Sequence, residues 1–201
     1  MKLFYTPGVC SLAPHILLRE AGLEFTLDRI GDDKRTQDGR DYLTLNPSGY
    51  VPTLEIEPGV ALTEGPAIMQ YIADHAPAAQ LAPEHGTLAR YQLQSWLNFI
   101  TSELHKSYSA LFKPNMPAEA RSTFKEQINT RLAHVEKTLA QQEHLLPSGF
   151  SAADAYLFVV VGWSGFVGIE IERYPAIVAH RKRVQARPAV QAAMRAEGLV
   201  K

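Results

Sequence analysis

Cys10 is the single cysteine of this 201-residue chain, and its position favours a reactive thiol. It stands between a short strand-like stretch, residues 2–5, and a run of helical periodicity that begins at Ser11. The amides and the dipole at a helix N-terminus stabilise negative charge, so a thiol there tends toward the reactive thiolate form. The alternative is a small buried packing residue, and position alone does not separate the two interpretations.

A proline and an acidic residue further along the chain could form a binding surface. Pro52 stands at the entrance of an expected strand, where a cis bond would leave the amide and carbonyl of Val51 free to pair with an extended peptide ligand. A trans proline on an edge strand is the alternative. Glu64 and Gly65 stand at the start of a helix whose free amides would hold a carboxylate, although Glu64 could simply complement the helix dipole.

His105 is the histidine whose position is most informative. A long helical pattern covers residues 88–112, and at 100° per residue its apolar side chains form one stripe. Asn98 and His105 lie close together on a separate polar stripe. His105 is therefore either a solvated residue or one that lines a cleft, and the same two interpretations apply to Glu103.

The motifs that the sequence lacks, together with its net charge, argue against several classes of function. The other histidines show no metal-ligand spacing, and neither a glycine-rich phosphate loop nor a Gly-x-Ser-x-Gly turn is present, so we expect no metal and no cofactor. The net charge of -1, without a basic run, argues against a nucleic-acid partner. The absence of a signal peptide and of a long apolar span predicts a cytoplasmic protein without a membrane partner.

Residues 1–75 alternate between strand and helix signals. Strands are expected at 2–5, 25–30, 50–57 and 60–63, a first helix from residue 11 to 21, a short helical piece at 40–45, and a further helix after Glu64. The order is βαβ followed by ββα. This order predicts a thioredoxin-like α/β domain in which the first two strands are parallel.

The rest of the chain carries helical signals and no strand. Residues 76–86 are rich in proline, alanine and polar side chains and are expected to be a linker. Residues 87–201 are expected to form an all-α helical bundle. Its predicted helices cover residues 88–112, 117–145, 151–168, 174–186 and 188–197. Ser151 and Asp154 form a capping-box pattern before the most apolar helix, which we interpret as structural.

Five segments, taken together, resemble bacterial glutathione transferases, in particular the beta class. They are residues 1–5 with 8–15, 46–52, 62–71, 96–100 with 103–106, and 150–156. Each segment is moderately specific, and all five occur in the family's order over nearly the whole chain. The resemblance implies a homodimeric enzyme that uses glutathione as co-substrate.

The resemblance also implies roles for residues of the first domain. Cys10 is similar to the family's active-site cysteine, which lies beside the glutathione sulfur and can form a mixed disulfide with it. Val51 would pair with the cysteinyl part of glutathione, and Pro52 would be cis. Glu64 and Gly65 would hold the γ-glutamyl end, although Gly65 replaces the serine found in many relatives.

The resemblance does not decide which basic residue lies near the glycyl carboxylate of glutathione. The loop before Lys34 looks one residue shorter than in close relatives, so Lys34 and Arg35 are interchangeable candidates. In the second domain, the resemblance implies that His105 faces Cys10 across the domain cleft. It also implies that Asn98 and Glu103 reach the glutathione of a partner subunit.

The expected function is therefore a detoxifying glutathione S-transferase, which conjugates reduced glutathione to small hydrophobic electrophiles. An alternative is a monothiol glutathione-dependent oxidoreductase or a reductive dehalogenase that works through Cys10. The segment Cys10-Ser-Leu-Ala13 has the place of a redox Cys-x-x-Cys motif but lacks its second cysteine. A non-catalytic scaffold of the same fold is a third interpretation.

Overall fold

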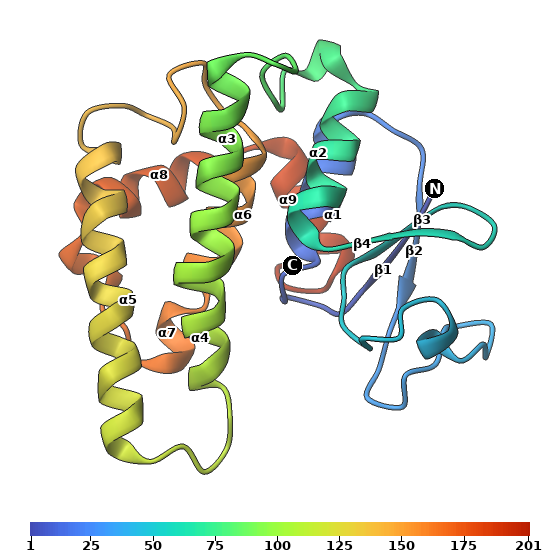
Figure 1. The fold of residues 1–201 in the computed structure, drawn as a ribbon, viewed down its shortest axis with the longest axis horizontal. Helices are drawn as coiled ribbons and strands as arrows, with labels where there is room; N and C mark the ends of the chain where they lie inside the picture. Colours follow the sequence, from blue (N-terminus) through green and yellow to red (C-terminus); the bar gives the residue numbers. More distant parts are fainter. The chain divides into compact units, whose positions relative to one another are not determined.

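The structure is a computed structural model that describes residues 1–201, and the chain divides into two compact units (Figure 1). The first unit comprises Met1–Ala82 together with Arg187–Lys201, and the second comprises Pro83–Ala186. The first contains the only sheet, and the second is helical. None of the helices combines the length and the apolar character that a membrane crossing needs.

The first unit is built on a four-stranded mixed sheet of order β2-β1-β3-β4. Its strands are β1 (Lys2–Tyr5), β2 (Thr26–Arg29), β3 (Thr53–Glu57) and β4 (Val60–Thr63). Helix α1 (Leu12–Glu20) connects β1 to β2, and these two strands are parallel, as such a crossover requires. β3 is antiparallel to both β1 and β4. The predicted βαβ-ββα order is confirmed.

The two faces of the sheet are covered by different elements. Phe4 packs with Ile30 and Tyr42 on one face, and Tyr42 belongs to a short 3-10 helix, η1 (Tyr42–Thr44). Side chains alternate along a strand, so Tyr5 points to the opposite face, where its ring meets His15 of α1. Helices α1, α2 (Gly65–His75) and α9 (Pro188–Ala196) lie together on that side (Figure 1). A second 3-10 helix, η2 (Pro77–Ala79), follows α2.

Helix α9 belongs to the first unit, whereas the prediction places residues 188–197 in the second domain. Helix α9 packs along α1 in the first unit. Arg187 forms a two-bond ion pair with Glu20, and Glu197 accepts a hydrogen bond from the Gly8 amide at 2.9 Å. The periodicity of residues 188–197 indicates a helix with one buried face, but it contains no information about which element that face contacts.

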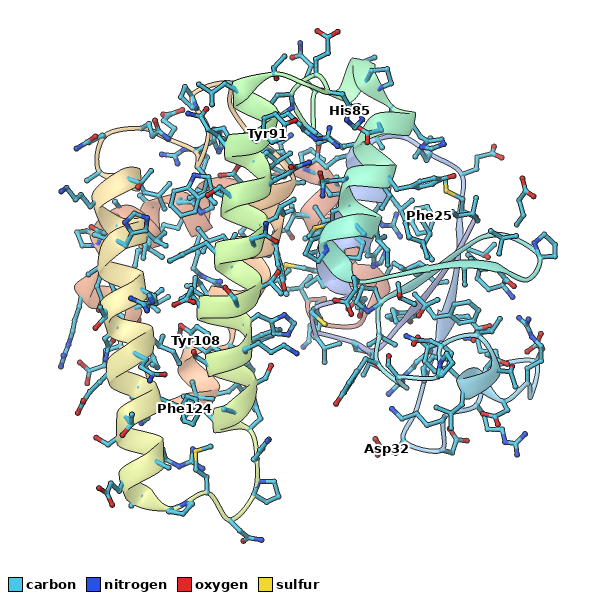
Figure 2. The ribbon with its side chains drawn as sticks, in the orientation of Figure 1. Phe25, Asp32, His85, Tyr91, Tyr108 and Phe124 are labelled. Atoms are coloured by element: carbon cyan, nitrogen blue, oxygen red, sulfur yellow. The ribbon has the colours of Figure 1, made fainter.

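The second unit is a bundle of helices, as predicted. Its helices are α3 (Leu88–Phe99), a π-helical segment η3 (Ile100–His105), α4 (Lys106–Leu111), α5 (Ala118–Leu139), α6 (Ala152–Gly162), α7 (Ser164–Val167), the 3-10 helix η4 (Ile171–Arg173) and α8 (Pro175–Gln185). Tyr108 of α4, labelled in Figure 2, is fully buried and shares a hydrogen bond of 2.7 Å with Ser164 of α7. This bond links two elements of the core.

Two predicted helices of this unit end earlier than expected. The helix expected over 117–145 ends at Leu139. The residues after it form a loop in which the side chain of Gln142 donates to the carbonyls of His144 and Leu145. The helix expected over 151–168 is interrupted at Trp163, so that α6 and α7 are separate.

Helix α6 begins with the predicted capping box. Its residues are almost all buried, and the carboxylate of Asp154 accepts hydrogen bonds from the backbone amide and the hydroxyl of Ser151. The amides of a first helical turn lack partners within the helix, and leaving them unpaired in the protein interior would be destabilising. The capping box supplies hydrogen-bond partners at this buried helix start.

We predict that Ser151→Ala lowers the free energy of unfolding by about 1 kcal/mol, because it removes one half of the capping box. Urea denaturation measures the change. Ser122→Ala on the exposed face of α5 is the matched control and should leave the midpoint unchanged. Equal effects of the two substitutions would contradict the assigned role of Ser151.

Candidate active site

Cys10 lies on a loop that hydrogen bonds hold between β1 and α1. The Ser11 hydroxyl accepts a bond from the Thr6 amide and donates one to the Thr6 carbonyl. The Thr6 hydroxyl in turn donates to the Ile30 carbonyl at 2.9 Å. Cys10 is half-buried at the N-terminal end of α1, the place that the sequence predicts for it. A thiol in this position benefits from the helix dipole when it ionises.

The antiparallel pairing of β1 with β3 brings the Cys10 loop to Val51. Phe4 near the end of β1 pairs with Thr53 at the start of β3, so the segments beyond these ends meet at one edge. The Cys10 thiol donates to the Val51 carbonyl, with an Sγ–O distance of 3.2 Å. The Val51–Pro52 peptide bond is cis.

The expectation for Val51 holds for one of its two backbone groups. Its amide has no hydrogen-bond partner in the chain and is available to a ligand. Its carbonyl instead accepts the bond from Cys10, so it is not free while the thiol keeps its proton.

The turn that carries Val51 is supported by side chains that the sequence analysis did not single out. Asn46 is buried, and its amide nitrogen donates to the Tyr50 carbonyl at 2.8 Å and to the Thr53 hydroxyl at 3.0 Å. Its oxygen accepts from the amide and the hydroxyl of Ser48. The Asn-Pro-Ser-Gly sequence is the signal that could have identified Asn46, since asparagine side chains commonly stabilise such turns.

Tyr42 supports the same turn through its hydroxyl group. Its hydroxyl donates to the Tyr50 carbonyl at 2.7 Å and shares a bond with the Thr53 hydroxyl. Burial raises the pKa of Tyr42, although bonds with Thr53 and Asn46 act in the opposite direction. The hydroxyl therefore remains a neutral hydrogen-bond donor at ordinary pH. Tyr42 and Asn46 both bind the Tyr50 carbonyl and so hold the turn together.

Glu64 and Gly65 lie beside this turn at the start of α2. A β-carbon built on Gly65 would be 3.9 Å from Cγ of Pro52. The Gly65 amide has no partner in the chain, and the side chain of Glu64 is exposed. Glu64 has a φ of +67°, a conformation that is costly for a residue with a side chain and that is often found at binding sites.

Lys34 and Arg35 differ in their surroundings. Cε of Lys34 lies 3.9 Å from where a β-carbon on Gly49 would stand, so this side chain extends along the turn that carries Val51. The guanidinium of Arg35 donates to the Gly39 carbonyl of its own loop and is exposed. Lys34 therefore lies beside this turn, whereas Arg35 is engaged within its own loop.

His105 lies in the second unit, at the end of the π-helical segment. Its Nδ1 forms a hydrogen bond of 2.6 Å with the Tyr156 hydroxyl, and its ring packs against Trp163. Burial, assisted by the charge of Lys106, lowers the pKa of His105 to about 4. The side chain is thus a neutral, half-buried imidazole, and the fully solvated alternative is wrong.

Asn98 and Glu103 precede His105 in the same unit. Asn98 is exposed, and Glu103 accepts a bond from Arg131 of α5 at 2.6 Å. The π-helical segment turns less per residue than an α-helix, so it shifts His105 relative to the stripe predicted at 100° per residue. Such segments frequently occur at functional sites.

One group of potential metal ligands exists, formed by His144, Asp154 and His180 in the second unit. No short ligand-spacing motif marks this group in the sequence, because its three residues come from separate segments. Asp154 and His180 are fully buried, and His144 is nearly so.

Comparison with known proteins defines the family. Residues 9–75 match the glutathione S-transferase N-terminal domain, and residues 102–197 match the glutathione S-transferase C-terminal domain. Glutathione S-transferase GstA of Escherichia coli O157:H7 is 44% identical over 99% of this chain and 100% of its own. The chain belongs to the glutathione S-transferase family.

Two solved structures support the assignment. A sphingomonad glutathione S-transferase in complex with glutathione has a TM-score of 0.96, and a beta class enzyme from Sphingomonas chungbukensis has a TM-score of 0.95. Each is 48% identical, and the match covers 100% of both chains. The resemblance to the bacterial beta class is confirmed.

We predict that Asn46→Ala lowers the free energy of unfolding by about 1–3 kcal/mol, because buried partners in the turn lose their bonds. It should also raise the KM for glutathione, since Val51 is no longer held in place. Ser48→Ala is the control, because Ser48 is exposed and its hydroxyl contributes a single bond to Asn46. Urea denaturation and initial rates at varied glutathione concentration measure both effects.

We predict that His105 makes the stability of the protein fall at acidic pH. Folding lowers its pKa from 6.5 to about 4, so the unfolded chain binds the extra proton between these values. Its contribution is fully present above pH 6.5 and decreases as the pH falls toward 4. The His105→Gln variant should lose less stability than the parent between pH 7 and about pH 5. Equal losses in urea denaturation would contradict the lowered pKa.

Proposed function

We propose that this protein conjugates reduced glutathione to hydrophobic electrophiles. The observation that carries the proposal is the junction of three features in the first unit: the Cys10 thiol, the backbone of Val51 and the start of α2. The family assignment and the glutathione-bound relative support it. No cofactor is required, because glutathione itself supplies the nucleophile.

Glutathione is proposed to bind along this edge as an extended peptide. The free amide of Val51 pairs with its cysteinyl part. The exposed carboxylate of Glu64 and the free amide of Gly65 hold the ammonium and the carboxylate of its γ-glutamyl end. Lys34, which extends along the turn, binds the glycyl carboxylate, whereas Arg35 is engaged with its own loop.

The glutathione thiolate forms beside Cys10 at the N-terminus of α1, where the dipole stabilises its charge. Its sulfur then attacks an electrophilic carbon, and the carbon–sulfur bond forms. In a substitution the leaving group departs with the pair of electrons from the broken bond; in an addition the electron pair of the double bond takes up a proton. His105 is proposed as the catalytic group of the second unit. Tyr156 fixes its ring through Nδ1, which leaves Nε2 for the ligand. Because burial disfavours the protonated form, the imidazole is neutral and acts through a hydrogen bond at Nε2.

The protein is proposed to act as a cytoplasmic homodimer. Asn98 and Glu103 are then available to the glutathione of the partner subunit, and the bond from Arg131 fixes the orientation of the Glu103 carboxylate.

Thiol–disulfide exchange through Cys10 is a second candidate, favoured by the half-buried position of this thiol and its contact with Val51. The Cys10 thiolate would attack the glutathione sulfur of a mixed disulfide between glutathione and a substrate thiol, and the substrate leaves as its thiolate. A second, reduced glutathione then attacks the Cys10–glutathione disulfide, which releases the Cys10 thiolate and oxidised glutathione.

The Cys10→Ala variant separates the two chemistries. Conjugation of an aryl halide with glutathione should persist at a reduced rate, because glutathione remains the nucleophile. Reduction of a mixed-disulfide substrate should be abolished. Complete loss of conjugation, with calorimetry still showing glutathione binding, would mean that Cys10 itself carries the covalent step.

We predict that Lys34→Ala raises the KM for glutathione about 10- to 100-fold, because a charge-assisted hydrogen bond contributes roughly 1.5–3 kcal/mol. Arg35→Ala should change it little and serves as the matched control. Steady-state kinetics at varied glutathione concentration decide the question. A larger effect from Arg35→Ala would reverse the assignment.

A further inference from the structure

Three side chains of types that can ligate a metal ion converge in the second unit, and none of them is among the residues assigned to glutathione binding. His144 comes from the loop after α5, Asp154 from the first turn of α6, and His180 from α8. One ligand atom of each lies within 4.8 Å of the other two. We propose that this cluster is a binding site for a divalent transition-metal ion of the zinc type, which ties these three segments together.

The spacing of the ligand atoms is close to what such an ion requires. In a tetrahedral zinc site with bonds of 2.0–2.1 Å, neighbouring ligand atoms are roughly 3.4 Å apart. Oδ1 of Asp154 lies 2.9 Å from Nε2 of His180 and 3.6 Å from Nδ1 of His144. The ligand atoms of His144 and His180 lie within 4.8 Å of each other, so the two imidazoles would have to approach by up to about 1.4 Å to give three ligands, with water in the fourth position. Two imidazoles and a carboxylate favour zinc or cobalt over calcium or magnesium.

His144 provides an independent observation in favour of the site. Its Nδ1 is buried and has no hydrogen-bond partner, although it lies 3.6 Å from the Asp154 carboxylate. A buried polar atom without a partner is destabilising, and a metal ion between these two atoms would satisfy it. The His144 side chain is 14% exposed, whereas those of Asp154 and His180 are fully buried. An ion would therefore enter past His144.

The carboxylate is already held in a fixed orientation. Oδ2 of Asp154 accepts two bonds from Ser151, and Oδ1 accepts one from the Leu145 amide at 2.9 Å. Partners of this kind orient metal ligands in known sites. When an ion binds Nε2 of His180, the proton that this atom shares with Asp154 moves to Nδ1. Nδ1 has no partner, so binding is expected to be weaker than in fully supported zinc sites.

The competing explanation is a hydrogen-bonded network that binds no metal. In that case the bond of 2.9 Å between His180 and Asp154 is the entire function of the pair, and His144 is a neighbour that contributes nothing. The two explanations differ in one measurable property, which is stoichiometric metal binding that depends on His144.

The test uses the full chain carrying Cys10→Ala, so that no thiolate can bind metal, after dialysis against a chelator. Cobalt(II) is titrated and followed by visible absorption, and zinc(II) is titrated by calorimetry. We expect one ion per chain, intense tetrahedral cobalt bands, and a rise in Tm with zinc. His144→Ala should weaken binding about 10- to 100-fold while the chelated protein keeps its helical content.

The control is His134→Ala, which removes an exposed histidine of α5 and should leave metal affinity unchanged. His180→Gln should weaken binding as His144→Ala does, and circular dichroism establishes whether it folds. Absence of a stoichiometric binding event, or binding that His144→Ala does not weaken, would overturn the proposal. Because every readout is metal binding or Tm, the result is independent of the glutathione chemistry.

Discussion

The antiparallel pairing of β1 with β3 is the constraint on which the first unit depends. Phe4 opposite Thr53 places the end of β1 beside the start of β3. The Cys10 loop continues from one of these ends, and the Val51–Pro52 turn leads into the other. A register shifted by one residue would turn Phe4 away from Tyr42 and would separate the thiol from the Val51 carbonyl. The same pairing therefore stabilises the core and assembles the site.

Polar side chains extend this constraint to the surrounding loops. Asn46 and Tyr42 hold the turn before β3, and Ser11 with Thr6 holds the loop after β1. Each of these hydrogen bonds is made within the first unit. The proposed glutathione-binding surface is thus largely preformed, so little conformational entropy needs to be lost when a peptide ligand adds to it.

The sequence predicted most of this architecture because its signals are local. Alternating residues, the Pro58-Gly59 turn and the capping box at Ser151 each specify their own segment. The positions of Cys10 and Gly65 at helix starts were predictable for the same reason.

What the sequence could not predict depends on contacts between distant segments. The packing of α9 on α1, the bond from Cys10 to Val51 and the convergence of His144 with His180 all join residues far apart in the chain. The π-helical geometry of residues 100–105 was not predicted either, because the sequence shows only helical periodicity there.

The central claim is that Cys10 lies beside the sulfur of a bound glutathione. It is tested most directly by the intact mass of the protein after incubation with oxidised glutathione, before and after a reductant. The account predicts a single glutathione adduct that the reductant removes, and because Cys10 is the only cysteine, the adduct needs no further mapping. A protein that remains unmodified, although calorimetry shows that it binds reduced glutathione, would contradict the placement of Cys10 beside the ligand.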